Sequence, residues 1–189
     1  MEVLLKENQP VYCDFYKNLL VEELSLCEYP HLLHYGKCSV IGITTCGDSG
    51  LYSLKNIRMN CIDRQLQIPN GTTGIVLLDT LVSGKIPVNR YCEVFGEAVL
   101  YDTIDDEANI LPKTSKDLMV ELLALEATNS SDYLNSAYTE LAKRYLPAIR
   151  VDSFNIIEQA SELIECNLML RCLKMDRRWR MNPKSENAS

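Results

Sequence analysis

Apolar and polar side chains alternate most regularly between residues 87 and 102, where "PVNRYCEVFGEAVLYD" predicts one long strand. One face of this strand is uniformly small or apolar, and it holds Cys92, Val94, Gly96, Ala98 and Leu100. A glycine inside a strand costs stability, so Gly96 predicts a bulge, a sharp bend or the close approach of another backbone. Small closed barrels need such corners, and this strand therefore favours a barrel.

Other segments carry β patterns as well. Residues 32–46 are rich in β-branched side chains and end at a turn signal over residues 47–50, so they predict the first strand of a hairpin. Residues 51–62 are expected to return as its second strand. Residues 74–82, "GIVLLDTLV", are apolar on both faces, as in a strand covered on both sides. Residues 146–152, "LPAIRVD", predict a fifth strand.

Helical spacing of apolar side chains marks the segments outside these strands. Residues 11–29 carry apolar groups at near-helical intervals, which predicts a helix or helical turn leading into the sheet. Residues 115–128 and 131–145 each have one apolar stripe, so they predict two short helices, or one helix broken at residues 129–131. A helical and acidic insertion over residues 103–145 therefore precedes the last strand.

The segment 153–175 has the longest helical pattern in the chain. One apolar stripe consists of Ile157, Ile164, Leu168 and Met175, and a second lies beside it with Ile156, Ala160, Leu163, Leu170 and Leu173. A helix that covers only one face of a barrel needs a narrower arc than this. The pattern therefore predicts that the helix meets both the barrel and a partner chain, with the first stripe as the partner-binding surface.

Length and composition place these elements in one domain. A chain of 189 residues with 47% hydrophobic content can bury its own core, so residues 1–175 are expected to form a single domain. The basic and then polar tail, 176–189, is expected to be disordered. No apolar run reaches the ~20 residues of a membrane span, and no secretion signal is recognisable at the start. The protein is expected to be intracellular, with no membrane partner and with scattered cysteines as buried thiols.

The net charge of −7 argues against a protein that holds nucleic acid unaided, because such affinity comes mostly from lysine and arginine. A surface that binds single-stranded DNA would have to be confined to a small region of the chain, or be completed by residues of a partner. Candidates for stacking and phosphate contact are Tyr52, Lys55, Arg58, Tyr91 and Tyr101, together with the basic cluster Arg177, Arg178 and Trp179. Strand tyrosines also serve as packing, and cations at a helix end also favour the helix dipole.

Signals of catalysis are absent from the sequence. It contains no P-loop, no GxSxG and no HExxH motif, so no enzyme activity and no cofactor are expected. His31 and His34 lie near Cys38, but no second ligand pair stands at zinc spacing, and no metal site is expected. The acidic residues 102–107 are explained by a solvated loop.

A hairpin, a third and a fourth strand, an insertion, a fifth strand and a final helix form the pattern of an oligonucleotide/oligosaccharide-binding (OB) barrel. The expected class is mainly β with added helices. Three stretches also resemble the smallest OB subunit of the telomere-capping (CST-type) complex built like replication protein A, or a diverged counterpart in another capping complex. They are "GKCSVIGITTC" with "LYSLKNIRM", "GIVLLDTLVSGKIPVNRYCEVFGEAVLY", and "YLPAIRVDSFNIIEQASELI".

The resemblance implies that the chain pairs with a larger OB-fold subunit through C-terminal helices. It also implies that the chain functions in the nucleus at chromosome ends, and that it binds single-stranded DNA weakly or only within the complex. The insertion 103–145 and the N-terminal segment depart from that family's compact members. An alternative therefore stays open, in which the chain is a chromatin-associated adaptor that recruits a protein through this insertion and never touches DNA.

Overall fold

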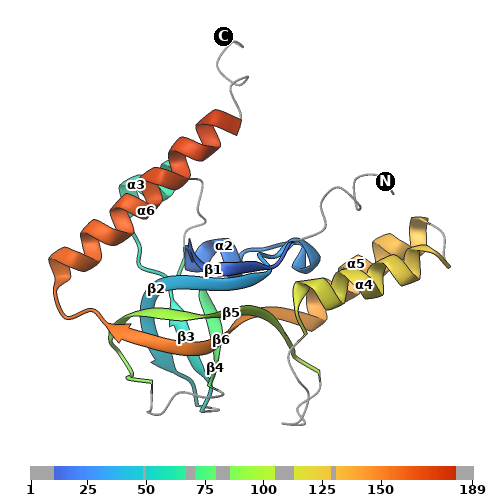
Figure 1. Ribbon diagram of the computed structural model, residues 1–189, viewed down its shortest axis with the longest axis horizontal. Coiled ribbons are helices and arrows are strands. Elements are labelled where there is room, and N and C mark those ends of the chain that lie inside the picture. Colours follow the sequence, from blue (N-terminus) through green and yellow to red (C-terminus); the bar gives the residue numbers. More distant parts are fainter. Residues whose placement is uncertain are drawn as a thin grey trace.

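The computed structural model describes residues 11–48, 50–66, 71–79, 86–104, 113–128 and 131–181 of the chain. The described elements run in the order β1 (Cys13–Leu19), α2 (Val21–Ser25), η1 (Pro30–Leu32), β2 (Gly36–Cys46), β3 (Tyr52–Lys55), α3 (Asn60–Gln65), β4 (Gly74–Asp79), β5 (Tyr91–Asp102), α4 (Ser115–Glu126), α5 (Ser131–Arg144), β6 (Tyr145–Ile156) and α6 (Ala160–Met181). Figure 1 shows the strands gathered in one body, with α6 leaving it on one side and the α4–α5 hairpin on the other.

Five strands close into a barrel. They are hydrogen-bonded in the order β2, β3, β4, β6 and β5, and a pairing between β2 and β5 completes the ring. The β4–β6 pair is parallel and the other pairs of the ring are antiparallel. This closed, mixed, five-stranded barrel is an OB fold, and it confirms the fold class that the sequence predicted. The second strand of the predicted hairpin, residues 51–62, is shorter than expected, because β3 ends at Lys55 and α3 follows.

The barrel interior is filled by alternate residues of each strand. Its fully buried side chains include Val40, Leu54, Val94, Ala98 and Ile149. Gly96 lies where the β5–β6 register shifts, and a Cβ there would overlap the carbonyl oxygen of Arg150. The bulge and the close backbone approach predicted for Gly96 are therefore confirmed, because only a residue without a side chain fits under the neighbouring strand.

The helix predicted for residues 11–29 is wrong over its first half. Residues 13–19 form the edge strand β1, parallel to β2, and only 21–25 are α-helical. The ring of Tyr16 packs edge-on against Phe95, and its hydroxyl donates a hydrogen bond to Asp152. This tertiary contact and the pairing with β2 stabilise an extended backbone despite the near-helical spacing of apolar groups.

The helical insertion is confirmed as two helices between β5 and β6. Thr114 caps α4: its hydroxyl accepts from the backbone N–H of Asp117, and the Asp117 carboxylate accepts from the N–H of Thr114. An ion pair between Arg144 and Asp102 ties the end of α5 to the end of β5. The hairpin projects from the barrel as an arm (Figure 1).

The C-terminal helix is shifted relative to its predicted span of 153–175. Residues 153–156 belong to β6, because β5 offers hydrogen-bonding partners along its whole length as far as the pair Cys92 and Ile156. Helix α6 begins at Ala160 and continues to Met181, so the first residues of the tail predicted as disordered are helical. Among the described helices, none is long and apolar enough to cross a membrane.

Candidate functional site

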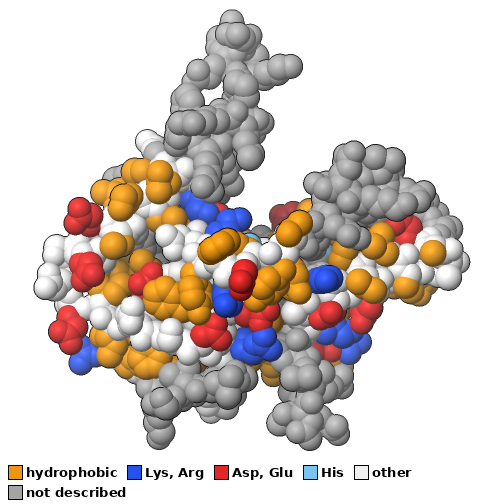
Figure 2. Space-filling view, in the orientation of Figure 1, with side chains coloured by type: hydrophobic (Ala, Val, Ile, Leu, Met, Phe, Trp, Pro, Cys, Tyr) orange, Lys and Arg blue, Asp and Glu red, His pale blue; other side chains and the backbone are white. Residues whose placement is uncertain are grey.

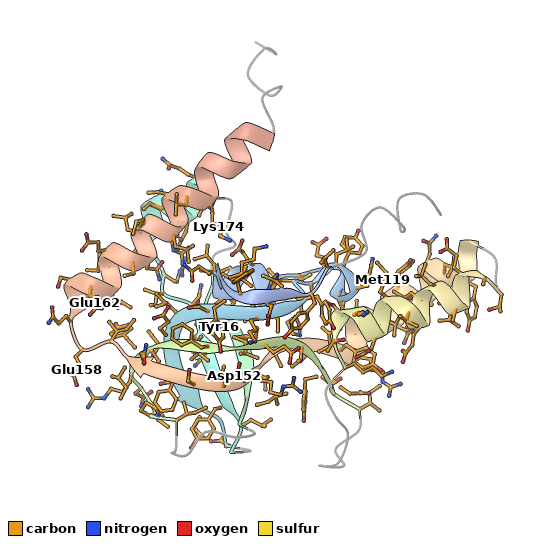
Figure 3. The ribbon with its side chains drawn as sticks, in the orientation of Figure 1. Tyr16, Met119, Asp152, Glu158, Glu162 and Lys174 are labelled. Carbon is orange, nitrogen blue, oxygen red and sulfur yellow. The ribbon has the colours of Figure 1, made fainter. Side chains whose placement is uncertain are left out.

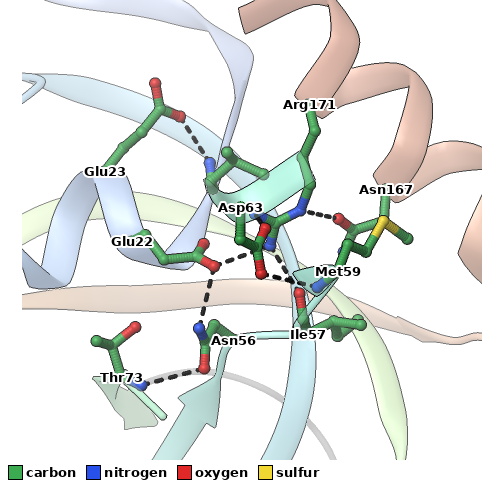
Figure 4. A network of polar contacts seen from close by, with 10 residues as sticks. Glu22, Glu23, Asn56, Ile57, Met59, Asp63, Thr73, Asn167 and Arg171 are labelled. Carbon is green, nitrogen blue, oxygen red and sulfur yellow. Dashed lines mark hydrogen bonds and ion pairs between the residues drawn. The ribbon is translucent and has the colours of Figure 1, made fainter. Parts of the chain in front are cut away.

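Helix α6 is fixed to the barrel by a buried polar network centred on Arg171 (Figure 4). The Arg171 side chain is 1% exposed. Its guanidinium donates to Asp63 of α3 at 2.5 Å and to Glu22 of α2 at 2.8 Å. It also donates to the carbonyl oxygen of Ile57 at 2.7 Å and to Asn167, one turn earlier in α6, at 2.7 Å. One side chain thus joins three helices that are distant in the sequence.

The two carboxylates of this network are themselves held in place. Asn56 donates to Glu22 at 3.0 Å, and the backbone N–H of Met59 donates to Asp63 at 2.8 Å. Burying ions is costly unless every lone pair and proton finds a partner, so such a network is stable in one geometry only. The network therefore fixes the rotation of α6 about its own axis.

That rotation turns the polar side of α6 inward. Side chains four residues apart form stripes along a helix, and the inward stripe is Leu163, Asn167 and Arg171, all buried. Lys174 adds an ion pair with Glu23 of α2 at 2.8 Å. Two of the three side chains in the buried stripe are polar, which is the reverse of an ordinary surface helix.

The apolar side of α6 faces outward. Two neighbouring stripes make up this surface, which we name the outer face: Ile164, Leu168 and Cys172, and then Glu165, Met169 and Leu173. The exposed fractions of its four largest apolar residues are 54% for Ile164, 38% for Leu168, 58% for Met169 and 56% for Leu173. Figure 2 shows hydrophobic side chains gathered over this helix at the surface. A contiguous apolar surface of this kind is typical of a site that another protein covers.

The predicted partner-binding residues fall in different places. Ile164 and Leu168 lie on the outer face. Ile157 is half-buried in the link before α6, where its backbone N–H donates to the carbonyl of Tyr91 at 2.9 Å. The side chain of Met175 lies outside the described residues.

Two of the predicted DNA-contacting residues lie on either side of one β2 residue, on the outside of the barrel. In the strand register, Ile43 of β2 stands opposite Lys55 of β3 on one side and Tyr91 of β5 on the other. Lys55 and Tyr91 are exposed, whereas Ile43 is half-buried. A cation and an aromatic ring thus flank one aliphatic side chain, an arrangement compatible with one stacked base beside a phosphate.

The remaining DNA candidates are scattered. Tyr52 packs against the barrel core, and Tyr101 lies at the far end of β5 from Tyr91. Arg58 is exposed in the segment between β3 and α3. The side chains of Arg177, Arg178 and Trp179, in the last turns of α6, lie outside the described residues.

Reasoning from sequence missed Arg171, Glu22 and Asp63. A signal was present, because Arg171 interrupts the apolar run "NLMLRCL" and follows Asn167 by one helical turn. Asn167 and Arg171 together mark a polar stripe along one side of the helix. Its buried partners could not be read locally, since Glu22 and Asp63 precede Arg171 by 149 and 108 residues.

The expectation that the cysteines are buried thiols is only partly right, because Cys46 and Cys172 are exposed. Cys38 and Cys92 are buried, and burial raises the pKa of the Cys38 thiol to about 12. His31 is buried near the rings of Tyr29 and Tyr138, and this burial lowers its pKa. Among the residues that the structure describes, no three His, Cys, Asp or Glu side chains are grouped so as to hold a metal ion.

Comparison with known proteins gives concordant similarities. The family model of the Modigliani telomere protection protein matches residues 14–174. Protein modigliani of Drosophila melanogaster is 32% identical over 168 residues, which cover 87% of this chain and 92% of that protein. The region matched by the family model includes the whole barrel ring, the helical insertion and all three charged residues of the network around Arg171.

Proposed function

Because this chain belongs to the Modigliani telomere protection family, we propose that it is a non-enzymatic OB-fold subunit of a telomere-capping complex in the nucleus, at chromosome ends. Its mode of action is to form a heterodimer with a larger OB-fold partner through the outer face of α6. The observation that carries this proposal is the inverted packing of α6, since a helix that turns its apolar side chains to water needs a second surface to cover them.

The outer face is large enough to dominate an interface. Burying a fully exposed apolar side chain contributes roughly 1.5 to 3 kcal/mol, and the four side chains here are 38% to 58% exposed, so covering them contributes about half of that value for each. They lie on a helix whose orientation is already fixed by the Arg171 network, so little conformational freedom is lost when a partner binds. A few central, preorganised side chains commonly supply most of the binding free energy of an interface.

The substitution Ile164→Glu tests the proposal. Ile164 is more than half exposed, so the variant is expected to fold, while a carboxylate in a covered apolar surface is strongly unfavourable. We expect the tagged wild-type chain to co-purify a larger OB-fold protein, identified by mass spectrometry, and the variant to lose at least ~10-fold of it.

The matched control is Val120→Glu, the same kind of change at an exposed position of α4. Circular dichroism must first show native-like spectra for both variants. Wild-type recovery of the partner by folded Ile164→Glu protein would refute the proposal. Loss with Val120→Glu alone would place the interface on the hairpin instead.

Direct contact with single-stranded DNA is proposed to be weak, or to depend on the complex. The chain is acidic overall, and the described strands place a predicted cation, Lys55, and a predicted aromatic ring, Tyr91, on either side of Ile43. We expect the isolated chain to bind an oligonucleotide weakly near physiological salt. Within the complex, Lys55→Glu should reduce the salt slope of binding by about 0.7, the contribution of one phosphate contact.

The adaptor alternative draws on the α4–α5 hairpin. This arm projects from the barrel, and it exposes Val120 of α4 and Tyr133 of α5. An adaptor that never touches DNA would leave DNA binding by the complex unchanged when Lys55 is substituted. The same salt titration therefore separates the two functions.

A further inference from the structure

Glu165 occupies an unusual position on the outer face of α6. It begins the stripe that continues with Met169 and Leu173, and its carboxylate is exposed. Its neighbours on the helix surface, three and four residues away, are Ser161, Glu162, Leu168 and Met169, none of them a cation. The stripe is therefore apolar except for one acid at its start.

Cations elsewhere on the described part of α6 are directed away from Glu165. Arg171 points inward to Glu22 and Asp63, and Lys174 pairs with Glu23. Further carboxylates lie nearby at the start of the helix, since Figure 3 shows Glu158 and Glu162 at the outer edge of the molecule where α6 begins. Figure 2 shows acidic side chains along that same edge, beside hydrophobic ones. This end of the outer face thus combines apolar and acidic character.

Covering the outer face would remove water from Glu165. An unpaired carboxylate in a desolvated interface is strongly unfavourable, and its cost is comparable to the gain from burying one or two aliphatic side chains. A partner that buries Met169 and Leu173 without pairing Glu165 would lose much of what it gains. A cation on the partner satisfies the carboxylate, and it also fixes the direction in which the partner lies.

We propose that the element that docks on the outer face is an amphipathic helix of another protein, with a lysine or arginine opposite Glu165. This inference rests on the proposed function and adds the chemistry and the direction of the partner. The partner's basic end lies against the start of α6, and its apolar stripe lies along Leu168, Met169 and Leu173. A second copy of this chain aligned in parallel would instead oppose Glu165 with another carboxylate, which is repulsive.

Three synthetic helical peptides test this inference. They share one leucine stripe and differ only at the flanking positions of one end, which carry lysine, glutamine or glutamate. Fluorescence anisotropy titration against the full chain is expected to give at least ~10-fold tighter binding for the lysine peptide than for the glutamate peptide at low salt. The order should reverse with the Glu165→Lys protein. It should persist with Glu28→Lys, a control of equal charge at an exposed residue outside α6.

Each other outcome overturns the inference in an identifiable way. Equal binding of all three peptides to the wild type removes the role of Glu165 and leaves the proposed heterodimer intact. Binding of none of them shows that the outer face does not accept a helix, and the Ile164→Glu co-purification then decides whether the heterodimer proposal survives. A concentration-dependent dimer of the chain alone, abolished by Ile164→Glu, identifies a second copy as the occupant.

Discussion

Helices α4 and α6 are attached to the same barrel, but they turn opposite kinds of side chain toward it. Helix α4 buries three apolar side chains: Leu118, Met119 and Leu122. Helix α6 buries Asn167 and Arg171 and leaves Ile164 and Leu173 in water. Apolar burial holds α4 through contacts without strong directional preference, whereas charge-assisted hydrogen bonds hold α6 in one orientation. Helix α4 thus adds to the hydrophobic core, whereas α6 leaves its apolar side chains exposed.

The largest expected effect comes from removing the centre of the network. Arg171→Ala leaves Glu22 and Asp63 buried without their cation, so we expect the free energy of unfolding to fall by about 3 to 5 kcal/mol. Urea denaturation measures the change. A triple variant, Arg171→Met with Glu22→Gln and Asp63→Asn, should recover much of the loss, because no buried charge then stays unpaired. A loss of less than about 1 kcal/mol for Arg171→Ala would show that solvent already reaches the carboxylates.

A matched pair of leucine substitutions tests the comparison directly. Leu122→Ala in α4 empties a buried site, and we expect it to cost about 2 to 5 kcal/mol. Leu173→Ala in α6 removes an exposed side chain, and it should change stability by no more than about 0.5 kcal/mol. Thermal unfolding of the two variants side by side gives both values. Equal losses would mean that the outer face of α6 is already covered within the isolated chain.

The smallest expected effect is on the pH dependence of stability, through His31, where the α4–α5 hairpin meets the rest of the chain. Burial lowers the pKa of His31, which packs near Tyr138 of α5, and burial lowers the pKa of His34 as well. As pH falls below about 6.5, the unfolded chain takes up protons that the folded chain does not, so stability should decrease on acidification. Above that pH neither histidine contributes. His31→Gln should reduce the slope of stability between about pH 7 and pH 5.5, and an unchanged slope would assign the effect to other groups.

The barrel and α4 were readable from sequence because their signals are local. Alternation along residues 91–102, the glycine at position 96 and the apolar stripe of residues 115–128 are each signals carried by the segment itself. The edge strand β1 could not be predicted from sequence. Its partner β2 is parallel, so no tight hairpin turn between the two strands signals their pairing. In the same way, apolar spacing located α6 and its broad arc but could not tell which side faces the barrel. That choice depends on two carboxylates from distant segments.

The distances along the chain also set the order of assembly. Arg171 meets groups that precede it by 149, 108 and 114 residues, and loops of this length must close before any of these hydrogen bonds forms. During synthesis, Glu22 and Asp63 emerge long before their cation, and they stay hydrated until it arrives. The orientation of α6 therefore depends on α2, α3 and Ile57 being in place. Before these contacts form, the outer face has no fixed orientation, so a partner that requires the oriented helix would bind the folded chain selectively.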